Sequence, residues 1–407
     1  MQEKNIKSLS FGCRLNALEC EKIKNIVAPN VDTAVIVNTC AVTAEAERQS
    51  AQAVRKIARE NPNVPIFVTG CGATRNTDLF TKIPNTIVIP NAQKMDATQY
   101  IDGLAQLNHG GDIVKFAHES PELSKQFIQI QNGCNHKCTY CVTRLLRGPA
   151  VSFPYSDILA DACAAVERGF YEIVITGVDS ASYAYKMGNK FIFISDVCKM
   201  LLRDVPEIRR LRISSLDPAS PEIFKIIDLI HSDPRMMPHL HLSMQSGSDT
   251  ILAAMGRRHN ADTVRKIVAA ADGITFSWDI ICGFPGETEE LFAETLDLVR
   301  EVKPIKIHAF PFSPRPGTVG AVLPDQVPRN ISKARVHKIT ELTDKNMADF
   351  MATCIGKTIS VLVENKNIGR TPNDIDVVIL GDKIPAKTIC NVKITGIKNG
   401  QFIGERI

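Results

Sequence analysis

Short apolar runs rich in β-branched residues alternate with amphipathic helical stretches along most of this 407-residue chain. This alternation is typical of parallel sheets, in which each strand is followed by a helix that packs back onto the sheet. Near the amino terminus, the predicted strands are residues 8–11, 34–37 and 66–69, and residues 44–59 form a predicted helix. We therefore expect an α/β, Rossmann-like domain over residues 1–108.

The same alternation resumes after a polar linker and continues through six strand and helix pairs. Six βα units in a row predict a partial TIM-like (β/α)6 barrel, whose working face is the carboxyl end of its strands. We assign this barrel to residues 120–345. Its candidate strands are residues 126–131, 172–176, 210–214, 239–243, 274–281 and 305–310.

Residues 356–407 differ from the rest because they contain only short strand and turn patterns, and we assign residues 350–407 to a separate C-terminal domain. The dipeptide Asn399-Gly400 lies between two such strands, and both residues tolerate the positive φ of a type I′ hairpin turn. A polar helix, residues 331–353, precedes this region. The tail is therefore predicted to be a small all-β barrel.

Composition excludes some classes of protein without naming a function. A formal net charge of +4, from 48 basic and 44 acidic side chains, permits nucleic-acid binding but does not require it. The sequence has no run of about 18 apolar residues, and its first residues lack the apolar core of a signal peptide. We therefore expect a cytoplasmic protein. Twelve cysteines in a reducing compartment favour metal or redox chemistry over a disulfide framework.

Three closely spaced cysteines, Cys134, Cys138 and Cys141, directly follow the first predicted strand of the barrel. Three thiolates on one loop can bind three irons of a 4Fe-4S cubane and leave the fourth iron open to a substrate or cofactor. The alternative is a structural zinc site. Such a site normally has four ligands, and His136 is the nearest candidate for the fourth.

Another three cysteines, Cys13, Cys40 and Cys71, each follow the carboxyl end of a predicted N-terminal strand. Parallel strands bring such positions to one edge of the sheet, where open α/β sheets bind their ligands. The alternative is that these are buried apolar residues, which is usual for isolated cysteines. Matched positions on three successive strands favour a second cluster with an open iron.

The spacing Cys-x-x-x-Cys-x-x-Cys after the first strand of a βα-repeat domain resembles the radical S-adenosylmethionine superfamily. Within it, the chain resembles the methylthiotransferases over nearly its whole length, and its tail resembles the TRAM module, a small RNA-binding barrel. Besides the central cysteines, the matching pieces are residues 11–16, 38–43, 70–71, 245–248, 283–288 and 312–318.

The resemblance implies two 4Fe-4S clusters and S-adenosylmethionine, which serves both as methyl donor and as source of a 5′-deoxyadenosyl radical. Residues 38–43 and 312–318 are most similar to the branch that acts on threonylcarbamoyladenosine. The implied function is insertion of a methylthio group at carbon 2 of this nucleoside, beside the anticodon of tRNA. An electron donor of the flavodoxin or ferredoxin type is also implied, whereas the sulfur donor cannot be deduced.

Two positions depart from the pattern: Arg144 replaces an expected proline, and Asp179 replaces a histidine common in that branch. Isopentenyladenosine in tRNA and an aspartate of a ribosomal protein therefore remain as alternative substrates. A non-catalytic RNA-binding protein with structural zinc is a more distant alternative.

Several residues near predicted strand ends are candidates for cofactor contacts. Missing side chains at Gly177 and Gly283 would let the cofactor approach closely, and Gln245 and Asp279 would hydrogen-bond it. Turn glycines and structural hydrogen bonds are the alternatives. The candidate RNA-binding residues are Arg147, Arg315, Lys357 and Arg370, although most such side chains are simply solvated. No general acid or base is assigned. The cysteines expected to be inert are Cys20, Cys163, Cys198, Cys282, Cys354 and Cys390.

Overall fold

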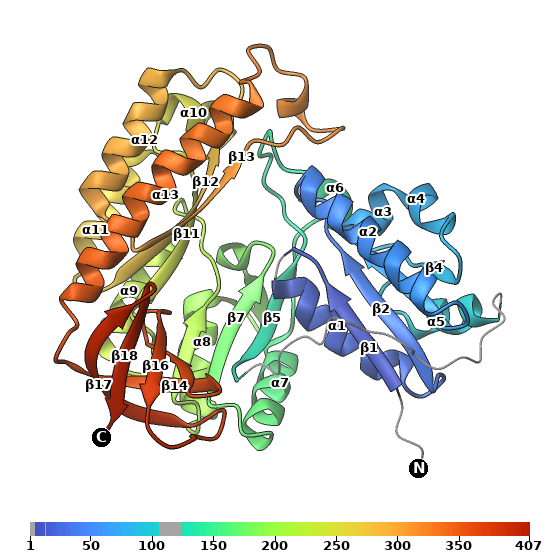
Figure 1. Cartoon of the computed structure of the whole chain (residues 1–407), viewed down its shortest axis with the longest axis horizontal. Helices are drawn as coiled ribbons and strands as arrows, with labels where there is room; N and C mark the ends of the chain where they lie inside the picture. Colours follow the sequence, from blue (N-terminus) through green and yellow to red (C-terminus); the bar gives the residue numbers. More distant parts are fainter. Residues whose placement is uncertain (1–4, 13, 106–123) are drawn as a thin grey trace. The chain divides into compact units, whose positions relative to one another are not determined.

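The computed structural model describes residues 5–12, 14–105 and 124–407, which form two compact units (Figure 1). Cys13 lies outside the described residues, as does most of the predicted linker. The N-terminal unit comprises residues 1–122, 133–150 and 313–321, and the barrel unit comprises residues 123–132, 151–312 and 322–407. This division into two units differs from the three predicted domains, because two later loops pack with the N-terminal sheet and the C-terminal strands pack with the central barrel.

A parallel four-stranded sheet in the order β1-β2-β3-β4 forms the centre of the N-terminal unit. Its strands are β1 (Asn5–Ser10), β2 (Thr33–Thr39), β3 (Ile66–Gly70) and β4 (Thr86–Val88). Its helices are α1 (Arg14–Val27), α2 (Ala44–Glu60), α3 (Cys71–Arg75), α4 (Thr77–Thr81) and α5 (Ala97–Leu104). Nearly every residue of β2 and β3 is buried because helices cover both faces, which explains their continuous apolar sequences.

The two faces of this sheet have separate apolar cores. Val35 and Val37 of β2 pack with α2 and α4 on one face. Ala34 and Ile36 point to the other face, where they pack with α1 and α5. The strand alternation thus distributes one apolar run over two helix layers. The short helix α6 (Thr143–Arg147), which follows the central cysteine loop, packs against α3.

The barrel unit contains six parallel strands, as the sequence predicts. They are β5 (Gln126–Asn132), β7 (Glu172–Gly177), β10 (Arg210–Ile213), β11 (His239–Gln245), β12 (Thr275–Cys282) and β13 (Lys306–Pro311). The ladder β10-β7-β5 also includes the short antiparallel strand β6 (Val151–Ser152), and β11-β12-β13 form a second ladder. A bridge between Leu216 and Leu242 joins the two, so the barrel is partial and its β10–β11 seam is irregular.

Helices surround these strands and bury a large apolar core that includes Trp278. The helices are α7 (Tyr155–Glu167), α8 (Ile194–Asp204), α9 (Glu222–Ser232), α10 (Asp249–Ala254), α11 (Ala261–Ala270), α12 (Glu289–Val302) and α13 (Arg329–Ala352). Among the described residues, none of the helices combines the length and the apolar character that crossing a membrane requires.

The sequence reading missed a hairpin between β7 and α8, formed by β8 (Ala184–Met187) and β9 (Lys190–Phe193). Its turn is Gly188-Asn189, and Gly188 has the positive φ of +62° that glycine adopts readily. This turn dipeptide was a usable signal, but strands of four residues each are too short for a clear period of two.

The C-terminal strands form a closed five-stranded barrel in the order β14-β15-β16-β18-β17. They are β14 (Thr358–Asn365), β15 (Ile368–Arg370), β16 (Asp376–Leu380), β17 (Ile389–Lys398) and β18 (Gln401–Arg406). Asn399 and Gly400 have φ angles of +52° and +72°, which confirms the predicted hairpin turn.

This small barrel packs at the amino ends of the central strands. Arg210, the first residue of β10, donates hydrogen bonds to the backbone oxygens of Ser360 and Arg370 at 2.8 and 3.1 Å. Asn373 bonds to the hydroxyl of Thr275, the first residue of β12, at 3.0 Å. The small barrel is therefore at the opposite end of the strands from the predicted working face.

Candidate cluster and cofactor site

The central cysteine loop begins at Gly133, directly after β5. Gly133 has a φ of +69°, and a side chain there would collide with the backbone oxygen of Pro149. The loop therefore requires glycine at this position because its two ends approach closely. The backbone nitrogen of Cys134 donates to the oxygen of Gly148 at 3.1 Å, which closes the loop at the end of α6.

Two short contacts hold the backbone near the three cysteines of this loop. The backbone nitrogen of Cys141 bonds to the oxygen of Cys138 at 3.2 Å, and that of His136 lies 3.4 Å from the sulfur of Cys134. All three cysteines are partly exposed, in contrast to the cysteines in the core. Three accessible sulfur ligands fit a cubane that has one iron free of protein ligands.

Cys40 and Cys71 lie at the carboxyl edge of the N-terminal sheet, as predicted. Cys40 follows β2, Cys71 begins α3 directly after β3, and both are buried. A side chain at Gly12 would collide with the sulfur of Cys40, so the backbone just before position 13 lies against that thiol. The loops after β1 and β2 therefore meet, and a Cβ at Gly72 would lie 3.0 Å from the backbone oxygen of Cys40.

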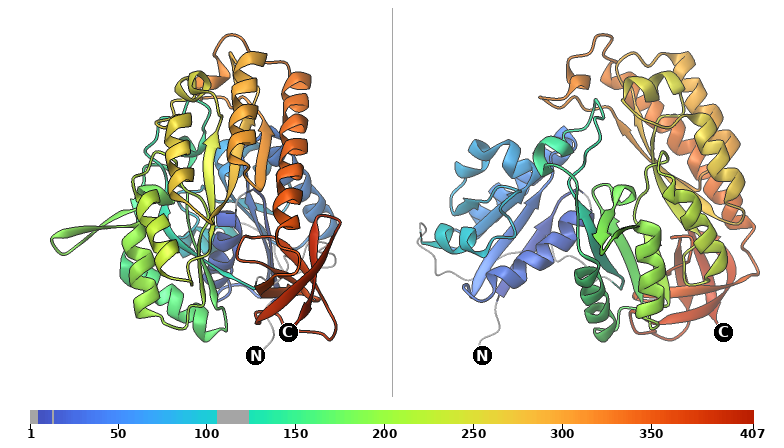
Figure 2. Two further views of the ribbon diagram at one scale, coloured as in Figure 1. Left: turned by 90° about the vertical axis from the view of Figure 1, so that its left-hand side faces the viewer. Right: turned by 180° about the vertical axis from the view of Figure 1, so that it is seen from behind.

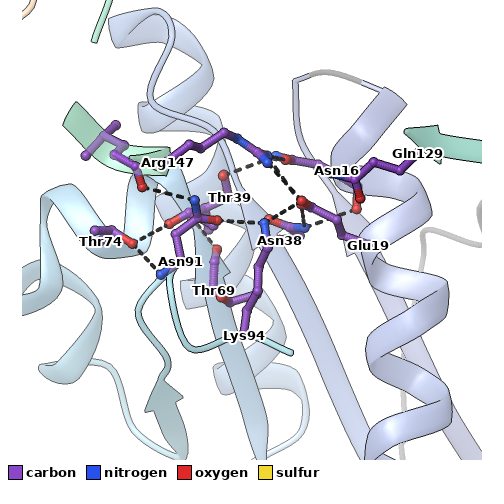
Figure 3. A network of polar contacts seen from close by, with 12 residues as sticks. Asn16, Glu19, Asn38, Thr39, Thr69, Thr74, Asn91, Lys94, Gln129 and Arg147 are labelled. Atoms are coloured by element: carbon purple, nitrogen blue, oxygen red, sulfur yellow. Dashed lines mark hydrogen bonds and ion pairs between the residues drawn. The ribbon is translucent and has the colours of Figure 1, made fainter. Parts of the chain in front are cut away.

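A buried group of polar side chains lies at the same edge (Figure 3). We call it the polar hub, and it consists of Asn16, Glu19, Asn38, Asn91, Lys94 and Arg147. The Glu19 carboxylate receives Lys94 Nζ at 2.6 Å and Arg147 Nη1 at 2.8 Å. The exposed fractions of these three side chains are 1%, 3% and 3%. The pairing compensates for their removal from water.

The polar hub connects the loops that bear the cysteines. Asn16 donates to the backbone oxygens of Phe11 and Thr39, at 2.8 and 3.3 Å, just before positions 13 and 40. Arg147 lies on the helix that follows the central cysteine loop, and it donates to Asn16 Oδ1 at 2.7 Å. Asn91 also donates to the oxygen of Leu146 in that helix, at 3.0 Å. The same network thus fixes the positions of both cysteine loops.

The charges of the polar hub shift the pKa values of its members. Burial by itself raises the pKa of the Glu19 carboxyl, but Lys94 and Arg147 outweigh this effect and hold the pKa below its usual value. Burial lowers the pKa of Lys94, although Glu19 opposes the shift. Lys94 also interacts electrostatically with Cys71. With two cations to one anion, the hub has a net positive charge that acts on the surroundings of that sulfur.

The four candidate cofactor residues lie at or near the carboxyl ends of barrel strands. Gly177 ends β7, and a Cβ there would lie 3.1 Å from Gln131 Oε1. Gly283 follows β12 with a φ of +77°, and a side chain there would collide with Ser332 of α13. Internal packing therefore already excludes a side chain at Gly283, whereas a side chain at Gly177 would only require Gln131 to shift by a few tenths of an ångström. Gln245 ends β11 and has a φ of +72°.

Asp279 differs from these because its side chain is about one-third exposed, at 32%. Its Oδ2 accepts a hydrogen bond from His241 Nε2 at 3.0 Å. The other nitrogen of His241 lies 2.8 Å from the hydroxyl of Ser277, which also contacts His239 at 2.9 Å. This chain of hydrogen bonds orients the Asp279 carboxylate on the inner side of β12.

The three arginines expected to bind RNA all form ion pairs with carboxylates in this structure. Arg147 belongs to the polar hub, and the buried guanidinium of Arg315 pairs with Glu47. Arg370 contacts three carboxylates of the C-terminal barrel, those of Glu364, Asp374 and Asp376. Lys357 is exposed. Among the four, Lys357 is the most exposed, and each of the three arginines pairs with acidic residues.

The polar residues of the hub are not among the site residues predicted from the sequence. Asn16 belongs to the matched piece 11–16, and Glu19 lies three positions further on the same face of α1. A polar pair on the sheet-facing side of a helix was therefore a usable signal. Lys94 lies in an irregular turn, and nothing in the local pattern distinguished it from a solvated lysine.

Comparisons with known proteins agree with this geometry. The model of the radical SAM superfamily matches residues 128–299, and that of the uncharacterized protein family UPF0004 matches residues 5–90. A Rickettsia prowazekii protein named threonylcarbamoyladenosine tRNA methylthiotransferase MtaB is 38% identical, over 96% of this chain and 95% of its own length. The Bacillus subtilis protein of that name is 30% identical, over 97% and 95%. This chain belongs to the radical S-adenosylmethionine methylthiotransferases of the MtaB type. Another relative of this methylthiotransferase is a Wolbachia pipientis protein named tRNA-2-methylthio-N(6)-dimethylallyladenosine synthase, 30% identical over 97% of this chain and 98% of its own length.

Solved structures support the fold of the methylthiotransferase. The radical S-adenosylmethionine methyltransferase TsrM from Kitasatospora setae aligns with a TM-score of 0.55, over 79% of this chain and 77% of its own. The identity is 12%, so the likeness concerns the fold alone. As a member of its family, the methylthiotransferase uses S-adenosylmethionine and an iron-sulfur cluster.

Five of the six cysteines expected to be inert are buried in the methylthiotransferase, and Cys163 is partly buried. Burial raises the pKa of the Cys20 and Cys198 thiols to about 12. These thiols therefore stay protonated near neutral pH and are poor metal ligands. Their burial agrees with the predicted role in the core.

Proposed function

We propose that this methylthiotransferase attaches a methylthio group to carbon 2 of threonylcarbamoyladenosine beside the anticodon of tRNA. The observation that supports this substrate is the 38% identity over nearly the full length to a relative named for it. The identity to the relative named for dimethylallyladenosine is lower, at 30%. The difference favours the threonylcarbamoyl substrate.

We assign the first 4Fe-4S cluster to Cys134, Cys138 and Cys141. The support is the donor set, which consists of three accessible thiols on a loop whose ends are fixed by Gly133 and Gly148. With S-adenosylmethionine on its open iron, this cluster would supply the electron that releases a 5′-deoxyadenosyl radical.

Contacts to S-adenosylmethionine are proposed for Gly177, Gln245, Asp279 and Gly283. The carboxylate of Asp279 is suited to accept hydrogen bonds from a ribose or an ammonium group, because His241 holds it in place and leaves it partly exposed. The two glycines offer backbone groups without side chains in front of them.

We assign a second 4Fe-4S cluster, which carries the sulfur to be transferred, to Cys13, Cys40 and Cys71. The close approach of the Gly12 backbone to the sulfur of Cys40 supports this assignment, because it shows that the loops after β1 and β2 meet. The excess positive charge of the polar hub is a second support, since it compensates for the negative charge of thiolate ligands. A flavodoxin- or ferredoxin-type protein is the proposed electron donor.

RNA binding is proposed for the C-terminal barrel, with Lys357 as one phosphate contact. Small barrels of this kind bind nucleic acids through basic faces. Because this barrel lies at the amino ends of the central strands, we expect it to bind a part of the tRNA other than the reacting base.

The test uses the anaerobically reconstituted enzyme and three tRNA samples that differ only in the nucleoside beside the anticodon. These carry threonylcarbamoyladenosine, dimethylallyladenosine or unmodified adenosine. After digestion, mass spectrometry should detect a new methylthio nucleoside only in the first sample. A product only in the second sample would transfer the assignment to dimethylallyladenosine, and no product in any sample would contradict tRNA as the substrate.

A further inference from the structure

The β8–β9 hairpin projects from the barrel unit and has one covered and one open face (Figure 2). Ile192 and Tyr185 pair across the hairpin and pack against the apolar core of the barrel. Phe191 and Phe193 point to the opposite face, and their exposed fractions are 58% and 37%. Two exposed phenylalanines on one short strand indicate a binding surface, because isolated soluble folds rarely expose such pairs.

The charge of the hairpin is uniformly positive. Residues 184–193 include Lys186 and Lys190 and no acidic residue. Both lysines are exposed, and neither has an ion-pair partner within the described part of the chain. Lys186 pairs across the ladder with Phe191, so a cation and an aromatic ring lie side by side on the open face. Lys225 of α9 also lies against Phe193, with its nitrogen 5.5 Å from the ring centre, although its charge is paired with Glu222 at 2.7 Å.

The hairpin lies on the side of the barrel where the substrate is expected. It follows β7, whose carboxyl end contributes Gly177. The small C-terminal barrel, in contrast, contacts the first residues of β10 and β12. A strand of seven residues such as β11 is roughly 23 Å long, at about 3.3 Å per residue. A nucleic acid bound at the small barrel therefore needs another contact to reach the working face.

We propose that the open face of the β8–β9 hairpin binds single-stranded nucleotides of the tRNA substrate. Bases stack on Phe191 and Phe193, and Lys186 on the same face contacts an adjacent phosphate. Lys190 pairs with Met187 on the other face, directly beside the turn, from where its long side chain reaches a further phosphate. The combination of aromatic rings with unpaired lysines favours RNA over an acidic peptide or a second copy of this chain, neither of which needs a stacking platform. The inference rests on the proposed function, because it takes tRNA as the substrate.

The test compares tRNA affinity and kinetics for hairpin variants and matched controls. The variants are Phe191→Ser and the double variant Lys186→Ala/Lys190→Ala. The controls are Ile101→Ser, which also removes an exposed apolar side chain, and Lys82→Ala/Lys266→Ala, which removes two exposed lysines elsewhere. All these side chains are at the surface, so the variants should fold.

Phe191→Ser should raise both the Kd and the KM for tRNA about tenfold and leave kcat nearly unchanged, as expected for a lost stacking contact. The lysine variant should lower the slope of log affinity against log salt by about 1.5, because two phosphate contacts are lost. The control variants should change neither the Kd for tRNA nor its dependence on salt.

Equal Kd values for the wild type and all variants would overturn the inference, whereas modification of tRNA by the wild type would still support the proposed function. If the wild type neither binds nor modifies tRNA, both are overturned. Sedimentation that shows a wild-type dimer and a monomeric Phe191→Ser variant with unchanged tRNA affinity would assign the hairpin to self-association and also overturn the inference.

Discussion

Replacing Glu19 with glutamine removes the one negative charge of the polar hub and leaves Lys94 and Arg147 buried without a counter-ion. With nitrogen to oxygen distances of 2.6 and 2.8 Å, each pair has a Coulomb energy of about 6 kcal/mol at an effective dielectric constant of about 20. Much of this energy offsets the removal of the charges from water. Breaking a buried pair from one side costs about 3–5 kcal/mol, and we expect a loss in this range for Glu19→Gln.

The stability lost on replacing Glu19 with glutamine should be smaller in acid than near neutral pH. The folded-state pKa of Glu19 lies below its ordinary value of 4.5, so the stabilisation is fully present above about pH 4.5. It is lost as the pH falls through the lowered pKa. The difference in unfolding free energy between the wild type and Glu19→Gln should therefore be largest near neutral pH and decrease in acid.

Urea unfolding of the apoprotein, followed by circular dichroism from about pH 2.5 to pH 8, measures this difference. Glu21→Gln is the matched control, because Glu21 is on the same helix and its exposed pair with Lys24 should contribute less than about 1 kcal/mol. Since the polar hub fixes both cysteine loops, Glu19→Gln should also bind less iron after reconstitution. A variant as stable as the Glu21→Gln control, with unchanged iron content, would refute the structural role of the hub.

Three further changes test other parts of the structure. Joint replacement of Cys13, Cys40 and Cys71 by alanine should lower the iron content from about eight to about four per chain and abolish methylthio transfer, while 5′-deoxyadenosine is still formed; iron that stays near eight would contradict the second cluster. Burial lowers the pKa of His239 to about 3, so below its ordinary value of 6.5 the unfolded chain binds one more proton and stability falls in acid. In urea unfolding, His239→Gln should lower the slope of the unfolding free energy against pH by up to about 1.4 kcal/mol per pH unit in acid, and an unchanged slope would contradict this reasoning. Gly283→Ala should lower the melting temperature, because the φ of +77° at Gly283 and the neighbouring hydroxyl of Ser332 on α13 both exclude a side chain. A melting temperature equal to that of the wild type would be inconsistent with this packing.

The strands of both units could be predicted because the apolar pattern of each strand indicates how many of its faces are covered. Strands β2 and β3 are continuous β-branched runs, which is the pattern of a strand covered on two faces. The carboxyl edge then follows from topology, so the placement of Cys40 and Cys71 needed no further information. Local pattern and parallel order together were sufficient for this part of the site.

The polar partners could not be predicted in the same way, since they depend on pairs that are distant in the sequence. Arg315 pairs with Glu47, 268 positions earlier, and Arg147 pairs with Glu19, 128 positions earlier. A sequence window around either arginine resembles an exposed, solvated segment. Only tertiary structure distinguishes a guanidinium that binds a carboxylate from one that is available to phosphate.

Because the N-terminal unit is completed by residues 133–150 and 313–321, its assembly cannot finish when its own sheet has been synthesised. On the ribosome, Glu19 can form its ion pair with Arg147 only after residue 147 has been synthesised. Glu47 can pair with Arg315 only after most of the central barrel has been synthesised. A fragment cut after residue 122 would contain the whole parallel sheet but would leave both carboxylates without these arginine partners. Domain swaps between relatives should therefore exchange all three segments together.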